Sequence, residues 1–182
     1  RGRCLTRLNL GCGGKKLPGY VNIDSCALEA PDVLCDLGAE RWPFEDSSID
    51  EAVAEHVLEH LPGESFFHFM RELYRVLKPG GAVKVTLPHP RHDIFLSDPT
   101  HCRAVMPGTL LMFSRGQLAE LRAKGMQLTD FGERCGVDFR MDPHVRYEFD
   151  AAVDPESPDL AWQSKHLNNI IKEWSTTMWA VK

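Results

Sequence analysis

A glycine-rich turn between two short apolar segments, at residues 7–24 (RLNLGCGGKKLPGYVNID), constrains this chain more than any other stretch. Residues 8–10 predict a first strand, and residues 20–23 predict a second strand that ends at Asp24. Glycines let a backbone approach a ligand closely, free N–H groups after a strand receive an anionic group, and an acidic side chain accepts hydrogen bonds from a ribose diol. The stretch therefore indicates a nucleotide-binding turn, with an ordinary tight turn as the alternative.

Length and composition narrow the class of protein. A chain of 182 residues suits one domain, residues 1–182, with a sizeable core. A net charge of -5 without a basic run disfavours a nucleic-acid partner. No apolar run is long enough to span a bilayer and no signal peptide opens the chain, so we expect a cytoplasmic protein without a membrane partner. The scattered cysteines, without a C-x-x-C pair, are typical of reduced thiols: Cys4, Cys12, Cys26, Cys35, Cys102 and Cys135.

Beyond the turn, strands alternate with helices, which indicates a parallel α/β sheet. A helix is predicted over residues 64–78, because its apolar side chains recur at intervals of three and four and share one face. A second helix is predicted over 114–124, where Ser114 and Gln117 form a capping box. Residues 138–160 are acidic, contain prolines and are expected to be an irregular excursion. The remaining predicted elements are strands at 31–37, 49–54, 82–87, 126–131 and 174–181 and a helix at 160–171.

The connection between the first two strands is unusually short. About ten residues separate them, which is near the minimum for a parallel crossover. The crossover helix is therefore predicted to be one short turn or absent. A helix dipole then contributes less to binding an anion at this turn.

Acidic residues fall at or just after several predicted strands. Asp24, Asp36 and Glu55 are such positions, and ligands of open parallel sheets bind outside the carboxyl ends of the strands. Asp36 could accept from an adenine amino group while Leu37 packs on the purine, and Glu55 or His56 could meet a group emerging between the first and fourth strands. For each residue alone, an exposed cap or turn position is the alternative.

An ordered series of motifs resembles a known family. LNLGCGGKK, the following Asp24, CDL, WPFEDSSID, EHVLEHL and ELYRVLKPGGAVKVTLP resemble class I S-adenosylmethionine-dependent methyltransferases, in particular the small type 11 group. The resemblance covers residues 8–90. It implies a Rossmann-like α/β fold: a mostly parallel seven-stranded sheet with an antiparallel last strand and helices on both faces. It also implies S-adenosyl-L-methionine as the cofactor.

The same resemblance implies roles for individual residues. It places the methionine end of the cofactor beside the glycine turn, the ribose at Asp24, and the adenine at Asp36 and Leu37. Glu55 and His56 would lie beside the methionine portion. The residues implied for the turn are Leu10, Gly11, Cys12 and Gly13.

The expected reaction is methyl transfer to an oxygen or nitrogen nucleophile of a small-molecule acceptor. Aligning nucleophile, methyl group and sulfur supplies much of the acceleration, and histidine is the natural base near neutral pH. His56 and His89 are the catalytic candidates, whereas His60 is expected to be structural. The His-rich segment 89–103 holds metal-ligand types, but their spacing matches no zinc signature, so no metal is predicted.

Other functions stay open at this point. A non-catalytic S-adenosylmethionine-binding partner subunit of a methyltransferase complex is the main alternative, and a homodimer is a second form of partner. An NAD-dependent dehydrogenase is disfavoured, because G-C-G-G lacks the third glycine of G-x-G-x-x-G.

Overall fold

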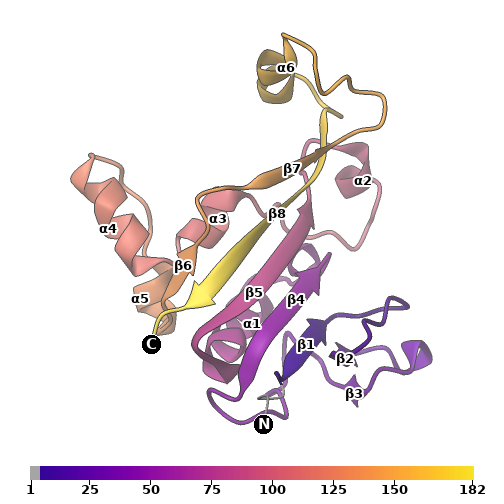
Figure 1. Ribbon diagram of the computed structural model, residues 1–182, viewed down its shortest axis with the longest axis vertical. Helices are drawn as coiled ribbons and strands as arrows, with labels where there is room; N and C mark the ends of the chain where they lie inside the picture. The colour runs from indigo at the N-terminus through magenta and orange to yellow at the C-terminus, as the bar shows by residue number, and fades with distance from the viewer. Residues whose placement is uncertain (1–4) are drawn as a thin grey trace.

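A computed structural model describes residues 5–182, which form a mixed sheet of eight strands in the order β3-β2-β1-β4-β5-β8-β6, with β7 also pairing with β8 (Figure 1). Strands β1 to β5 are parallel, and β8 runs antiparallel to β5, β6 and β7. The predicted α/β fold with an antiparallel last strand is confirmed, although β7 brings the count to eight. The strands are β1 (Arg7–Leu10), β2 (Val21–Asp24), β3 (Val33–Leu34), β4 (Ile49–Glu55), β5 (Leu77–Pro88), β6 (Phe139–Met141), β7 (Arg146–Phe149) and β8 (Ile171–Ala180).

The helices are distributed unevenly along the chain. The connections between β1, β2 and β3 contain no α-helix and only one short 3-10 turn, as the brief crossover predicted. Figure 1 shows α1 behind β4 and β5, and α6 standing away from the sheet. The helical elements are η1 (Ala27–Glu29), η2 (Leu58–His60), α1 (Gly63–Val76), α2 (Asp93–Leu96), α3 (Pro107–Leu111), α4 (Arg115–Ala123), α5 (Phe131–Cys135) and α6 (Leu160–His166).

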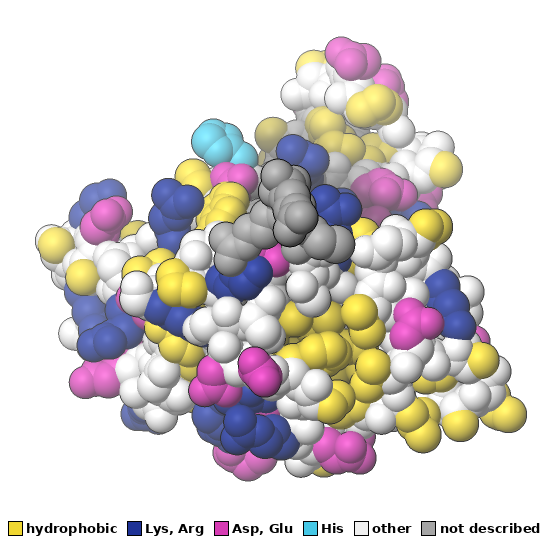
Figure 2. Space-filling view, turned by 60° about the horizontal axis from the view of Figure 1, so that its bottom comes forward, with side chains coloured by type: hydrophobic (Ala, Val, Ile, Leu, Met, Phe, Trp, Pro, Cys, Tyr) yellow, Lys and Arg dark blue, Asp and Glu magenta, His cyan; other side chains and the backbone are white. Residues whose placement is uncertain are grey.

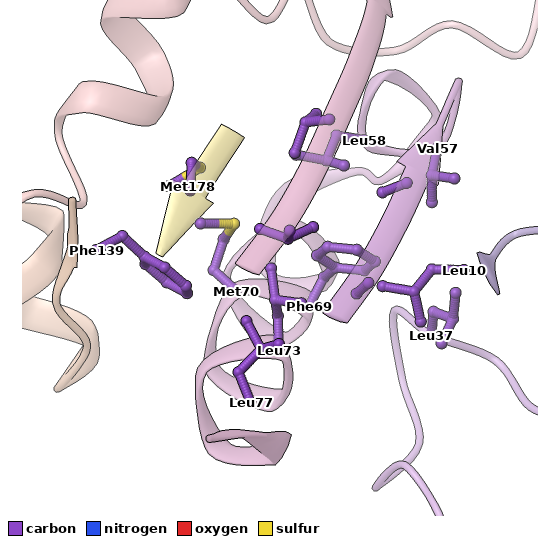
Figure 3. Packing of buried hydrophobic residues seen from close by; sticks show 14 of the residues in the cluster. Leu10, Leu37, Val57, Leu58, Phe69, Met70, Leu73, Leu77, Phe139 and Met178 are labelled. Atoms are coloured by element: carbon purple, nitrogen blue, oxygen red, sulfur yellow. The ribbon is translucent and has the colours of Figure 1, made fainter. Parts of the chain in front are cut away.

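The core lies between the sheet and α1. Strand register aligns Leu8, Ala52, Val83 and Met178 across four strands, and all four side chains are fully buried. The apolar face of α1 packs there, with Phe69, Met70 and Leu73 gathered beside Met178 and the strands in Figure 3. The predicted helical face is therefore confirmed. Burial of these side chains is the main force that fixes α1 on the sheet.

Some sequence predictions were wrong in the C-terminal half. Residues 126–131 form no strand, Met126 is half exposed, and α5 begins at Phe131. The excursion 138–160 is only partly irregular, because β6 and β7 lie within it. These strands are three and four residues long. Such short edge strands depend on pairing with β8 rather than on their own pattern.

The predicted capping box of α4 is also wrong. Ser114 is the N-cap residue but its side chain makes no capping hydrogen bond. Gln117 instead binds the main chain of Met141: its Nε2 donates to the Met141 carbonyl (3.1 Å), and its Oε1 accepts from the Met141 N–H (2.8 Å). This pair ties α4 to β6.

A buried polar network joins α1 to the loop before β4. The Arg75 guanidinium donates to both carboxylate oxygens of Glu72 (2.8 and 2.6 Å) and to the Trp42 carbonyl (3.0 Å). The Trp42 N–H in turn donates to Glu72 (2.8 Å). Burial opposes ionisation of Glu72, but the hydrogen bonds from Arg75 and Trp42 outweigh it and hold its pKa below the usual value. The indole of Trp42 is buried and packs edge-on against Phe69.

The distribution of charge and the state of the cysteines describe the surface and the thiols of the chain. Figure 2 shows one face, on which Lys and Arg side chains are interspersed with Asp and Glu rather than gathered in one stripe. Among the described residues, no helix is long and apolar enough to cross a membrane. Cys4 lies outside the described residues. The other cysteines are free thiols: Cys12, Cys26, Cys35, Cys102 and Cys135.

Candidate active site

A cavity of about 600 Å³ lies at the carboxyl ends of β1, β2 and β4. It is bounded by the glycine turn after β1, the loop after β3 and the segment that leads from β4 into α1. The structure therefore brings together side chains from distant parts of the chain at the predicted edge of the sheet. The predicted residues that line it are Gly11, Gly13, Asp24, Asp36, Leu37 and His56.

Two glycines of the turn adopt conformations that side chains disfavour. Gly11 has φ +64° and Gly13 has φ +48°. A Cβ on Gly11 would lie 2.6 Å from Val57 Cγ2, so close packing of the turn against Val57 requires a glycine there. A Cβ on Gly13 would meet nothing within 4 Å, although the residue lines the cavity. Gly13 thus keeps open a space that a ligand can approach.

Gly13→Ala is expected to weaken ligand binding much more than it weakens the fold. The methyl group would enter the open space beside the turn, and the left-handed conformation would cost about 1 kcal/mol. Gly125→Ala is a matched control, since Gly125 has φ +86° and open surroundings outside the cavity lining. Both variants should lose similar thermal stability, and calorimetry should show weaker S-adenosylmethionine binding in Gly13→Ala alone. Equal affinities would place the ligand away from Gly13.

Asp24 is held in place by the turn itself. The Gly13 N–H donates to Asp24 Oδ2 (2.8 Å), and the Cys26 N–H donates to Oδ1 (2.8 Å). A carboxylate offers about four acceptor positions, so each oxygen retains about one for another donor. The geometry fits a vicinal diol, whose two hydroxyls can donate to the two oxygens of one carboxylate.

The main-chain donors predicted for the methionine end already have partners within the chain. The Cys12 N–H donates to the Ile23 carbonyl (2.9 Å), and the Gly13 N–H is used by Asp24. Leu10 is fully buried in the core, and the side chain of Cys12 is also buried. Neither Leu10 nor Cys12 lines the main cavity. Their cofactor-binding roles therefore stay predictions.

The loop after β3 forms the opposite wall. Asp36 accepts from the Gly38 N–H (2.9 Å), and the Leu37 carbonyl accepts from the Trp42 indole (3.1 Å), so both residues are fixed in the cavity wall. A Cβ on Gly38 would lie 2.9 Å from Ser65 Cβ. The loop consequently approaches the start of α1 closely, and Gly38 and Ser65 both line the cavity.

Glu55 is the last residue of β4 and His56 follows it, and the two side chains have different surroundings. Glu55 pairs with Lys15 Nζ (2.7 Å) and lines a smaller cavity of about 220 Å³ on the other side of the turn. His56 lines both cavities in a left-handed conformation (φ +54°). Its ring nitrogens lie 3.3 Å from Glu59 and 3.2 Å from Glu173. The Glu59 carboxylate, aided by Glu173 and opposed by burial, raises the pKa of His56.

The second catalytic candidate lies elsewhere. His89 is buried just beyond β5, its Nδ1 accepts from the Arg91 N–H (3.3 Å), and it is not part of the cavity lining. Burial, with the charges of Arg91 and His92, lowers the pKa of His89. The catalytic role of His89 stays a prediction that the cavity does not support.

Sequence reasoning missed the side chains that hold the turn in the absence of a crossover helix. Asn9 Nδ2 donates to the Lys15 carbonyl (2.9 Å) and to Asn22 Oδ1 (2.9 Å), which also accepts from the Leu17 N–H (2.8 Å). Asn22 donates in turn to Asp32 (2.8 Å). Both asparagines are buried, and each lies between two apolar neighbours in its strand. A polar residue between apolar strand residues was the sequence feature that could have identified these two side chains.

The sequence also did not identify the apolar residues of the cavity wall. Val57 and Leu61 line the cavity together with Ser65. Their spacing of four residues is the same as that of core side chains at the start of a helix, so the sequence alone does not separate a ligand contact from packing. Among the described residues that line the cavity, Asp24 and Asp36 are the acidic ones, and none is Lys or Arg. This balance favours a ligand that carries positive charge.

Comparisons with known proteins agree with the fold. Residues 21–85 match the family model of the type 11 methyltransferase domain. The ribosomal RNA-processing protein 8 of Rattus norvegicus is 37% identical over 82 residues, 42% of this chain and 17% of that protein. A sterol 4-C-methyltransferase of Caenorhabditis elegans is 36% identical over 69 residues, 38% of this chain and 18% of that protein. The chain thus spans less than a fifth of the length of these relatives.

A solved structure extends the likeness to the whole fold. An S-adenosylmethionine-dependent methyltransferase from Archaeoglobus fulgidus superposes with a TM-score of 0.66 at 16% identity, covering 97% of this chain and 86% of that chain. The resemblance to class I S-adenosylmethionine-dependent methyltransferases is therefore confirmed. These findings support a methyltransferase, with S-adenosylmethionine as the cofactor that the family and the fold imply.

Proposed function

We propose that this chain binds S-adenosylmethionine in the main cavity and transfers its methyl group to an oxygen or nitrogen atom of a small-molecule acceptor. The observation that carries the proposal is the placement of Asp24. Its carboxylate is fixed 2.8 Å from the Gly13 N–H, at the carboxyl edge of the sheet, and retains acceptor positions that suit a ribose.

The charge of the cavity supports this cofactor over a dinucleotide. S-adenosylmethionine carries a sulfonium and an ammonium group, which the carboxylates of Asp24 and Asp36 would favour. A dinucleotide pyrophosphate is normally bound at the N-terminus of the helix after the first strand. Residues 11–20 contain no helix, and no Lys or Arg of the described chain lines the cavity. The residues present therefore fit a cationic nucleoside better than a diphosphate.

Each wall of the main cavity would hold one part of the cofactor. Asp24 would hold the ribose, Asp36 and Leu37 would hold the adenine, and the open face of Gly13 would admit the methionine portion. The bound cofactor supplies an electrophilic methyl group. The contribution of the protein is chiefly to hold donor and acceptor in line and to exclude water.

His56 is the proposed base for an acceptor that must lose a proton. Its two ring nitrogens face the carboxylates of Glu59 and Glu173, so the ring must turn one nitrogen toward the acceptor to take the proton. The carboxylate that stays beside the other nitrogen would then stabilise the imidazolium that forms. His56 is then catalytic, whereas Glu59 and Glu173 act as positioning residues.

Calorimetry combined with a turnover assay tests the proposal. The full chain should bind S-adenosylmethionine and its demethylated product and should not bind NAD. Incubation with S-adenosylmethionine and fractions of a small-metabolite pool should release the demethylated product. A folded chain that binds neither form of the cofactor contradicts the proposal.

A non-catalytic partner subunit is the second candidate. It is favoured by the short connections of β1, β2 and β3, which contain no α-helix. Cofactor binding without turnover by the isolated chain, with turnover appearing once a second chain is added, would support this candidate. Turnover by the isolated chain excludes it.

A further inference from the structure

Three potential metal ligands meet beside the main cavity. One ligand atom each of Glu59, His60 and His101 lies within 4.8 Å of the other two. The two imidazole rings are 4.7 Å apart, and His60 also lines the cavity. The Cys102 and Arg103 N–H groups donate to the Glu59 carbonyl (2.9 and 3.1 Å), which fixes the loop that carries His101 against η2.

Glu59 is a buried acid whose carboxylate oxygens accept no hydrogen bond from the described residues, although two histidines face one of these oxygens. Its side chain is 1% exposed. His56 Nδ1 lies 3.3 Å and His101 Nε2 lies 4.0 Å from Oε1. Among residues 5–182, the ion pairs of Glu59 are with these histidines alone. An ionised carboxylate in such a place is costly unless a cation compensates it.

The hydrogen-bond network assigns the tautomers of both histidines. The Phe95 carbonyl can only accept, so His101 Nδ1 (2.8 Å away) carries the proton. The Thr100 hydroxyl donates to Asp98 (2.6 Å) and therefore accepts from His60 Nδ1 (2.9 Å). Each neutral ring then has its lone pair on Nε2. An imidazole whose Nδ1–H is anchored in this way is the usual form of a metal-binding histidine.

A second carboxylate adds to the negative charge. Asp98 Oδ2 lies 3.8 Å from His101 Nε2. His101 Nε2 therefore faces both Glu59 and Asp98, and a divalent cation would offset both of them. Two imidazoles with a carboxylate, and with a position left for water, make up the ligand set of several catalytic zinc sites and of non-haem Fe(II) sites.

We propose that Glu59, His60 and His101 bind one divalent transition-metal ion, with Asp98 or water completing its coordination. Two ligand atoms that each lie about 2.1 Å from a tetrahedral zinc ion are about 3.4 Å apart, so binding requires ligand atoms that now lie within 4.8 Å of one another to close by up to about 1.4 Å. The sequence predicts no metal, because the spacing of ligand types in residues 89–103 matches no zinc signature. His60 and His101 lie 41 positions apart, and only the fold brings them together. The proposal does not depend on methyl transfer.

Titration of the chelator-treated full chain with Co²⁺ tests the site. Wild-type protein should bind a single equivalent and develop visible d–d bands, and Zn²⁺ should abolish them. Glu59→Gln and His101→Ala should each weaken Co²⁺ binding more than about 10-fold. His166→Ala is the matched control, because His166 is exposed on α6 and bonded only to its own helix, and this variant should bind as wild type does.

Further measurements distinguish loss of the metal ligands from unfolding and from damage to the cofactor site. Circular dichroism should show that each variant is folded, and His60→Ala provides a third variant on the cavity side of the cluster. Asp24→Asn should retain Co²⁺ binding, because Asp24 is not among the proposed ligands. Co²⁺ affinity that is equal in wild type and in a folded His60→Ala/His101→Ala double variant overturns the proposal. A strong cobalt–thiolate band, indicating Cys102 as the ligand, also overturns it.

Discussion

Asp24→Asn is expected to abolish measurable S-adenosylmethionine binding while the protein stays folded. The substitution keeps the shape of the side chain but leaves one acceptor oxygen for two backbone N–H groups and two ribose hydroxyls. Hydrogen bonds to a charged group contribute about 1.5–3 kcal/mol each. Losing two of them corresponds to about a 10²- to 10⁴-fold weaker Kd. Calorimetry with the demethylated cofactor measures the effect.

A charge-matched control makes this prediction specific. Glu120 is exposed on α4, so Glu120→Gln removes one negative charge far along the chain from the cavity lining. Its Kd should equal that of the wild type, and thermal melts should show both variants folded. Asp24→Asn binding within about threefold of wild type would mean that this cavity is not the cofactor site.

Arg75→Met is expected to lower the free energy of unfolding by about 3–5 kcal/mol. The substitution keeps an unbranched apolar stem but leaves the Glu72 carboxylate buried, with the Trp42 N–H as its remaining donor among the described residues. It also frees the Trp42 and Phe44 carbonyls, which accept from Arg75 at 3.0 and 2.8 Å. Urea unfolding monitored by tryptophan fluorescence measures the loss.

Arg122→Met provides the exposed comparison. Arg122 pairs with Asp130 at 3.3 Å on the surface of α4, where such pairs contribute at most about 1 kcal/mol. Adding Glu72→Leu to Arg75→Met should recover part of the lost stability, because it removes the unpaired charge. If the single variant at Arg75 costs no more than the one at Arg122, the buried network does not support the fold as described.

The buried network of Glu72, Arg75 and Trp42 also predicts how acid changes the stability of the protein. Since the pKa of Glu72 is held below its ordinary value of 4.5, its contribution to stability is complete above about pH 4.5. The contribution is lost as the pH falls through the lower pKa of the folded state. The difference between wild type and Arg75→Met should therefore shrink in acid.

The sequence predicted the elements whose patterns are long enough to be distinctive. The helix predicted over 64–78 matches α1 up to Val76, with residues 77 and 78 already in β5, and the strand predicted over 82–87 lies within β5. Many core side chains repeat at one period in each of these elements. The strands β6 and β7 were not found. With three and four residues, they carry almost no period of their own and are stabilised mainly by pairing with β8.

The site likewise contains residues that are close in the sequence, which could be predicted, and residues that only the fold brings together. Gly13 and Asp24 lie eleven positions apart and could be linked from the sequence, since one turn joins them. His60 and His101 could not, because their meeting depends on how a loop folds back onto η2. The burial of Glu59 is likewise a property of the assembled fold.

The asparagine-tied turn has a consequence for how the protein moves. Residues 11–20 are secured by Asn9 and Asn22 side chains rather than by the repeating main-chain bonds of a helix. Such a segment can open by itself while β4 and β5 stay paired. A ligand in the cavity should therefore slow deuterium uptake in residues 11–20 far more than in the central strands. Ordering these residues would cost conformational entropy, which would lower the net free energy of binding.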